Sequence, residues 1–117
     1  MARLAQLQLD EASGITLATV DGEIDLSNAA ELEMAISHAV GNEALGLVVD
    51  LVRVDYLDSS GVTLLFNLAR RVARRQQAFA VVVPAEAHVR EILSLSGATE
   101  ALPLRESLAE ALRELDG

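Results

Sequence analysis

The polar run Asp58-Ser59-Ser60-Gly61 holds the residue types best suited to chemistry in this chain. An apolar run precedes it and a helical repeat follows it, so the pattern predicts a loop that opens a helix. Unsatisfied backbone N–H groups and the positive end of the dipole converge at such a point, and Asp58 or Ser59 could serve there simply as an N-cap. Gly61 stands at a helical position where glycine costs about 1 kcal/mol relative to alanine, so we expect another backbone or chain to approach it closely.

Three classes of enzyme use such residues, and the sequence argues against each. A serine hydrolase would pair Ser59 with His38 or His88, but the G-x-S-x-G elbow is missing and both histidines fall on the polar sides of predicted helices. An aspartic protease needs an uninterrupted Asp-Ser/Thr-Gly triplet in an all-β chain. A phospho-accepting receiver domain fits the length and Asp50, but it needs an acidic pair after its first strand and a lysine after its last, and the chain has no lysine.

The composition excludes further classes of site and partner. With no cysteine, and with two isolated histidines among scattered carboxylates, the chain shows no ligand spacing for a metal, and we expect no cofactor. The net charge is −9 and the three aromatic residues give no stacking platform, so nucleic acid is not an expected partner. A signal peptide and a membrane-spanning run are not apparent, which predicts a cytoplasmic protein without membrane insertion.

The first 40 residues predict a hairpin and a helix. Leu7 and Leu9 alternate with glutamines, residues 10–14 form a turn, and a second strand runs to Ile24, so the hairpin spans 4–24. The apolar parity of the second strand shifts between residues 17 and 20, which indicates either a bulge or a strand covered on both faces. Ser27 or Asn28 then caps a helix, with Glu31 completing a capping box. The expected buried stripe of that helix is Leu32, Ala35, Ile36, Ala39 and Val40.

The rest of the chain alternates strands and helices. Residues 47–49 and 79–83 are apolar runs typical of strands buried on both faces of a parallel sheet. Helices are expected over 60–75, 85–95 and after Ser107, with a short edge strand at 101–104. The fold class is therefore α/β: one domain, 1–117, with an N-terminal β-hairpin and a mixed, mostly parallel sheet of four to five strands with about four helices.

Three motifs resemble those of a known family. The segments Val48-Val49-Asp50-Leu51 and Tyr56-Leu57-Asp58-Ser59-Ser60-Gly61-Val62 resemble the signature of STAS domains, specifically the bacterial anti-sigma factor antagonists. Gly22-Glu23-Ile24-Asp25 and Leu93-Ser94-Leu95-Ser96-Gly97 resemble two further parts of that family's pattern. The resemblance covers nearly the whole chain and implies the STAS fold.

The resemblance also implies a function based on partner switching. An unphosphorylated antagonist binds an anti-sigma factor, often itself a serine kinase, and so frees the sigma factor. Phosphorylation of the first serine after the aspartate, here Ser59, breaks the complex, and a serine phosphatase resets it. The protein is expected to be a monomer or weak dimer and not an enzyme. Thr63 stands where many relatives have a small residue or glycine.

The expected partner-binding surface surrounds the phosphorylation site. Its members are Asp25, Ser27, Asn28, Asp58, Ser59, Ser60, Gly61 and Val62. In this fold Asp25 should lie at the strand end next to Asp58, where it either contacts the kinase or only caps a helix. Two alternatives remain open. In one, the chain has a structural role as a STAS subunit of a lipid-transport ABC complex or of a stress-signalling assembly. In the other, it is an enzyme of a class that its motifs do not reveal.

Overall fold

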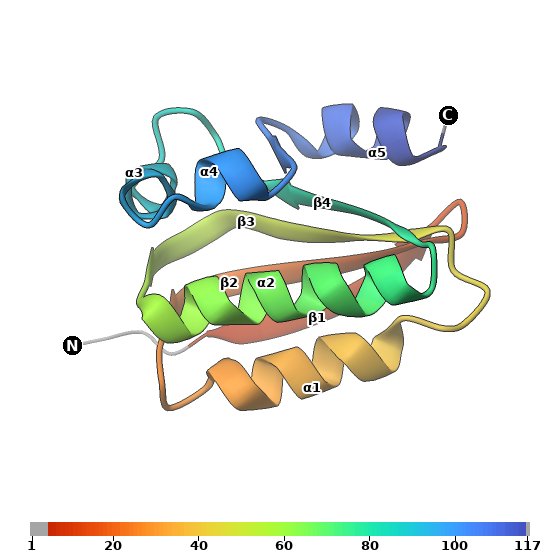
Figure 1. Ribbon diagram of the computed structural model, residues 1–117, viewed down its shortest axis with the longest axis horizontal. Coiled ribbons are helices and arrows are strands. Elements are labelled where there is room, and N and C mark those ends of the chain that lie inside the picture. The colour runs from red at the N-terminus through yellow and green to blue at the C-terminus, as the bar shows by residue number, and fades with distance from the viewer. Residues whose placement is uncertain (1–4, 117) are drawn as a thin grey trace.

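A five-stranded sheet forms the centre of the computed structural model, which describes residues 5–116 (Figure 1). The strands lie in chain order across the sheet, and only the first pair is antiparallel. They are β1 (Gln6–Ala12), β2 (Ile15–Ile24), β3 (Gly46–Leu57), β4 (Ala78–Val82) and β5 (Leu104–Arg105). The predicted α/β class, the hairpin and the parallel remainder are confirmed.

The hairpin turn is tighter than predicted. Ser13 and Gly14 adopt left-handed backbone angles, with φ of 53° and 83°, as a two-residue type I′ turn requires. Residues 10–12 therefore stay in the strand, and Asp10 pairs with Leu17. The predicted start of the hairpin at residue 4 lies outside the described residues. Both alternatives for β2 occur: its register shifts between Thr19 and Asp21, and it is covered on both faces, with Ile15 buried on one and Ala18 on the other.

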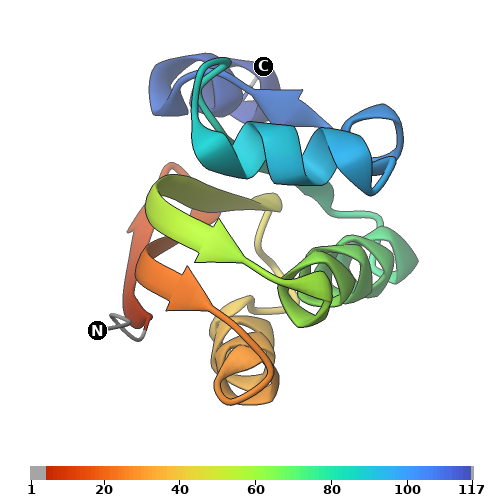
Figure 2. The same cartoon turned by 90° about the vertical axis from the view of Figure 1, so that its left-hand side faces the viewer.

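The helices follow the strands in the predicted order, with one addition. They are α1 (Ala29–Ala39), α2 (Ser59–Arg74), α3 (His88–Leu95), α4 (Ala98–Ala101) and α5 (Leu108–Asp116). The extra helix, α4, is a single turn that follows Gly97, whose φ is 79°. Figures 1 and 2 show α1 and α5 on opposite sides of the sheet, with α2 running beside α1.

Alternate residues of the central strands face two separate hydrophobic clusters. Leu47, Val49 and Leu51 belong to the larger cluster, which contains buried residues of α1, α2 and α3. Val48 and Val82 belong to the smaller one, against which α5 packs. Both faces of β3 and β4 are therefore covered, which explains why these strands have continuous apolar sequences.

The predicted capping box of α1 is wrong, and its predicted buried stripe is confirmed only in part. Asn28 occupies the N-cap position, but its side chain makes no capping hydrogen bond, so the capping box with Glu31 does not form. Ala35 and Ala39 are exposed, whereas Ser37 is buried. Leu32, Ile36 and Val40 of the predicted stripe are buried. The Asn67 amide of α2 donates to Glu33 of α1 at 3.0 Å. Within residues 5–116, no helix is long and apolar enough to cross a membrane.

Candidate functional site

Asp58 caps helix α2 and leaves Ser59 as the first helical residue. The Oδ1 atom of Asp58 accepts hydrogen bonds from the backbone N–H groups of Ser60, at 2.8 Å, and Gly61, at 3.3 Å. The sequence left open whether Asp58 or Ser59 is the N-cap, and the structure assigns that position to Asp58. The side chain of Ser59 is thus not needed to cap the helix.

The hydroxyl group of Ser59 is accessible to a partner. Ser59 is exposed, and among the residues that the structure describes its hydroxyl has no hydrogen-bond partner. It lies in the first turn of a 16-residue helix, where the helix dipole favours negative charge. The position therefore suits a serine that acquires an anion by modification, because little native structure depends on its hydroxyl.

The ends of β2 and β3 bring two loops together beside Ser59. Ile24 and Leu57 are register partners and are the last residues of their parallel strands. The backbone N–H of Asp58 donates to the carbonyl of Ile24 at 3.2 Å. Figure 2 looks onto this edge, where the two strands point toward the viewer. Asp25 and Asp58 each follow one of the paired ends, as the sequence predicted for Asp25.

The loop from Asp25 to Asn28 is held by its own side chains. The carboxylate of Asp25 accepts hydrogen bonds from the backbone N–H and the hydroxyl of Ser27. Asn28 accepts from the N–H of Asp25 at 3.0 Å and donates to the carbonyl of Glu23 at 2.9 Å. These contacts explain why Asn28 does not cap α1, since its amide is turned back toward β2. They form a turn in which the Asp25 carboxylate is half-buried.

Gly61 packs inside the protein and does not form part of the exposed surface that a partner could contact. It is buried, and a Cβ atom built there would lie 2.8 Å from the Cβ of Leu57 and 3.3 Å from Ile24. The close approach expected at this glycine therefore comes from the chain's own strand ends. Ser60 and Val62 are half-buried at the same turn, so the sequence-predicted site residues do converge on one edge.

An apolar groove of about 360 Å³ lies beside Ser59. It is lined by Tyr56, Leu57, Asp58, Ser59 and Val62 on one side and by Ile92, Leu95 and Ser96 on the other. The side chain of Leu95 at the end of α3 is 84% exposed, and Leu26 in the loop after β2 is 81% exposed. We call Asp25, Leu26, Tyr56, Ser59 and Leu95 the Ser59 face.

Sequence reasoning missed the two leucines of the Ser59 face. Leu26 is a lone apolar residue in a polar loop, and Leu95 follows the inward-facing Leu93 by two positions, which turns it to another side of α3. Neither residue gave a specific signal, because single exposed apolar residues are common on protein surfaces, and only the structure shows that Leu95 lines a groove beside Ser59.

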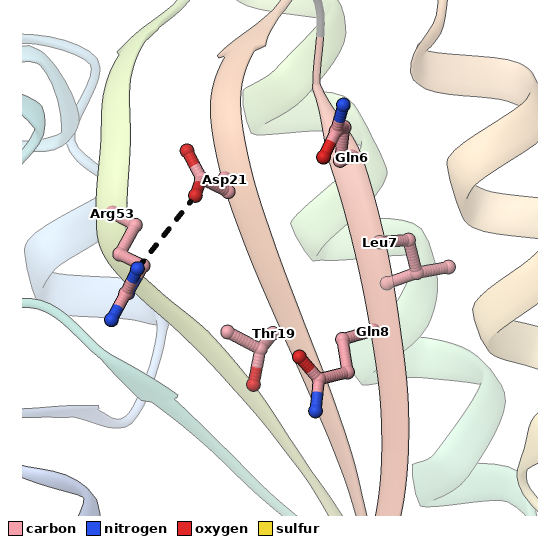
Figure 3. Close-up of a pocket in the computed structure, with 6 residues that line it drawn as sticks. All are labelled: Gln6, Leu7, Gln8, Thr19, Asp21 and Arg53. Atoms are coloured by element: carbon pink, nitrogen blue, oxygen red, sulfur yellow. Dashed lines mark ion pairs between the residues drawn. The ribbon is translucent and has the colours of Figure 1, made fainter.

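Alternative catalytic groups are not assembled in residues 5–116. His38 and His88 are exposed, and Asp50 bonds the backbone N–H of Val52 two residues away. No group of three potential metal ligands occurs in this described range. A larger hollow of about 420 Å³ lies on the open face of the hairpin, where Arg53 and Asp21 approach to 4.0 Å among glutamine and threonine side chains (Figure 3).

Comparison with known proteins gives consistent matches. The STAS domain family model matches residues 6–111. BtrV of Bordetella bronchiseptica, named provisionally as an anti-sigma factor antagonist, is 30% identical over 111 residues, which are 92% of this chain and 95% of BtrV. The anti-sigma-F factor antagonist RsfB of Mycobacterium tuberculosis is 31% identical over 105 residues, covering 90% and 84% of the two chains.

The fold agrees with that of a solved structure. The crystal structure of an anti-sigma factor antagonist from Mycobacterium paratuberculosis superposes with a TM-score of 0.86 at 29% identity. The match covers 97% of this chain and 96% of that one. The similarity therefore includes the hairpin, the Ser59 turn and the C-terminal helix.

Proposed function

Because the chain belongs to the STAS domain family of anti-sigma factor antagonists, we propose that its unphosphorylated form binds an anti-sigma factor with serine kinase activity and releases the sigma factor. Phosphorylation of Ser59 then breaks the complex, and a serine phosphatase restores the binding form. Antagonists of this family are regulators without enzymatic activity of their own, so the chemistry belongs to the partner.

One observation carries the proposal: an exposed serine hydroxyl without a structural role stands at the rim of an apolar groove. Asp58 alone caps the helix, so adding a phosphate to Ser59 removes no cap. The exposed Leu26, Tyr56 and Leu95 supply apolar area for a partner that covers Ser59. A partner seated there would bury the modified residue in contact with these side chains.

The size of the electrostatic effects indicates that phosphorylation of Ser59 would dissociate the complex without unfolding the protein. A phosphoserine carries about −1.5 to −2 charges at neutral pH, and the helix N-terminus stabilises such charge by only about 0.3–1 kcal/mol. The carboxylates of Asp58 and Asp25 at the same edge oppose it. In the free protein water solvates the phosphate, so the fold tolerates it. In the complex the phosphate dianion would lose its water, and a resulting loss of about 3–4 kcal/mol in binding free energy would reduce the affinity by two to three decades.

The partner-binding surface that we propose keeps most of the residues expected from the sequence. Asp25, Ser27, Asn28, Asp58, Ser59, Ser60 and Val62 contribute, with Leu26 and Leu95 added, whereas the buried Gly61 shapes the turn from behind. We propose that the protein acts in the cytoplasm, where sigma factors work, as a monomer or weak dimer. The net charge of −9 favours a basic surface on the partner.

The proposal is tested with a kinase-type anti-sigma factor from the same genome. Titration calorimetry measures its affinity for this protein before and after incubation with ATP, and mass spectrometry locates the phosphate. Phosphorylation at Ser59 with an affinity loss of about 100-fold or more is the expected result. Equal affinity of both forms, or a complex that never phosphorylates Ser59, would overturn the switch and favour the structural role.

A further inference from the structure

The C-terminal end of α2 carries a concentration of positive charge. Arg70, Arg71, Arg74 and Arg75 fall within six positions, in a chain that has nine arginines, no lysine and a net charge of −9. All four are exposed. In Figure 1 this end of α2 lies opposite the end at which Ser59 starts the helix.

Within residues 5–116, the charges of three of these arginines are not neutralised by a carboxylate. Arg75 donates to the carbonyl of Val40 at 3.1 Å and so holds the end of α1. For Arg70, Arg71 and Arg74, which we call the arginine cluster, no ion pair to a carboxylate occurs within residues 5–116. Their charges therefore remain available to a group from outside.

Helix stability alone accounts poorly for the arginine cluster. Cations in the last turn gain about 0.3–1 kcal/mol from the helix dipole. Like charges three or four positions apart lose about 0.2–0.5 kcal/mol per pair, and Arg70 with Arg74 and Arg71 with Arg74 are such pairs. The gain and the loss are comparable, so these charges contribute little net stability to α2.

The cluster surrounds a hollow and is partly preorganised. Glu33, Asn67 and the three arginines line a depression of about 230 Å³. The side chain of Arg70 donates to Asn67, whose amide group donates to Glu33. This chain of hydrogen bonds fixes one guanidinium group, and a fixed guanidinium group presents a planar pair of donors that matches a carboxylate.

We propose that the arginine cluster is a second docking surface, which binds an acidic segment of a partner protein, a short stretch rich in aspartate and glutamate. A nucleic acid or an anionic membrane fits less well, because either extends past three arginines into the acidic remainder of a chain with nine excess negative charges. A short acidic segment meets only the local positive field, which screening confines to about 8 Å at physiological salt.

Docking at this surface is independent of the state of Ser59. Ser59 and the arginine cluster occupy opposite ends of one helix of 16 residues. At 1.5 Å per residue, Arg70 and Arg74 lie about 16 and 22 Å from Ser59 along the axis, at least about two screening lengths. A phosphate on Ser59 therefore leaves the affinity of the cluster nearly unchanged, and two partners can bind together.

The test uses a fluorescein-labelled octapeptide of alternating Glu and Asp, whose binding is followed by fluorescence anisotropy at about 0.15 M NaCl, where the screening length is about 8 Å. The variant Arg70→Gln/Arg71→Gln/Arg74→Gln should bind at least about tenfold more weakly than the wild type. The control Arg113→Gln, an exposed arginine on α5, should bind like the wild type. The affinity should fall as salt rises, and Ser59→Asp should leave it within about twofold.

Three results would overturn the proposal. The first is that the wild type does not bind the peptide, or that the wild type and the triple variant bind it with equal affinity. If the triple variant then also has a lower Tm, the arginine cluster serves to stabilise the helix. The second is tighter binding of single-stranded DNA or phosphatidylserine vesicles with the same dependence on the arginines, which would change the class of partner. The third is a large loss of peptide affinity in Ser59→Asp, which would contradict independence while leaving the proposed switch intact.

Discussion

The backbone N–H of Leu26 donates a hydrogen bond of 3.2 Å to the carboxylate of Asp58, a residue 32 positions later in the chain. The other oxygen of the same carboxylate caps α2. One side chain therefore fixes both the loop that carries Asp25 and the turn that carries Ser59. Because these loops are ordered before a partner arrives, less conformational entropy is lost on binding.

Removal of the Asp58 carboxylate should destabilise the protein. Asp58→Ala leaves the N–H groups of Ser60 and Gly61 without their acceptor and releases Leu26, so the free energy of unfolding should fall by about 1–2 kcal/mol. Urea denaturation measures the change. The neighbouring control Ser59→Ala should stay within about 0.5 kcal/mol of the wild type. Equal losses for the two variants would contradict the assignment of the cap.

Alanine and aspartate at position 59 should act oppositely on the anti-sigma partner. Ser59→Ala adds neither charge nor bulk, so binding should persist and become insensitive to ATP. Ser59→Asp adds part of the phosphate charge and should weaken binding, though less than phosphorylation does. Titration calorimetry compares both with Thr63→Asp, in which the charge sits at an exposed position one turn further along α2. If negative charge at Ser59 controls the affinity, Thr63→Asp should weaken binding less than Ser59→Asp. A larger loss of affinity in Thr63→Asp would contradict charge control at Ser59.

Gly61→Ala should destabilise the protein, although alanine is the better helix former. The new methyl group would lie 2.8 Å from the Cβ of Leu57, so the start of α2 must move away from β3. Overpacking of this kind costs about 1–3 kcal/mol. The matched control is Gly41→Ala, where nothing lies within 4 Å of the added atom. Thermal melts should show a lower Tm for the first variant and an unchanged or higher Tm for the second.

Leu95→Ser should weaken partner binding without loss of stability. The side chain of Leu95 is 84% exposed, so the fold gains little from it, whereas a partner in the adjoining groove would bury it. An affinity loss of about tenfold is expected for a buried leucine at an interface. Met34→Ser, at a 62% exposed position on α1, serves as the control and should bind normally. Normal binding by Leu95→Ser would show that the groove is not part of the partner interface.

Asp25→Asn should separate function from stability. The amide oxygen can still accept the hydrogen bonds from Ser27, so the turn should persist and the Tm should change little. The negative charge is lost, and with it a contact that we expect the kinase to use. Phosphorylation of Ser59 by the anti-sigma partner should therefore slow down. A marked drop in Tm with a normal rate of phosphorylation would instead assign Asp25 a purely structural role.

The sequence predicted the fold well where the hydrophobic period was unambiguous. The bounds of β2 are as predicted, and α2 begins one residue before the predicted start at Ser60. The predicted edge strand at 101–104 is wrong in its bounds, because β5 spans only Leu104–Arg105 and Ala101 ends α4. The capping box at Asn28 failed because a capping motif describes one helix, whereas the amide of Asn28 is bound by Glu23 and Asp25 in the preceding strand and loop. That competition is tertiary in origin and leaves no trace in a local pattern.

The sequence predicted the polar residues of the candidate site but not its apolar residues. Asp58 and Ser59 stand in a recognisable run, but the groove between Val62 and Ile92 exists only after α2 and α3 have both packed against β3. The spacing of residues along the sequence does not show how close these two helices lie in the fold. For the same reason the sequence could suggest a close approach at Gly61 without identifying Leu57 as the neighbour.

The order of the strands has a consequence for how the chain emerges from the ribosome. Every strand pairs with the one made just before it, in the order β1-β2-β3-β4-β5. Each new strand therefore meets a finished edge, and none must wait for a later segment to be inserted beside it. Only α5 arrives after the sheet is complete, and it covers Ile15 and Val48, residues of the first half of the chain. This second apolar face therefore stays exposed during synthesis until α5 has emerged and packed against it.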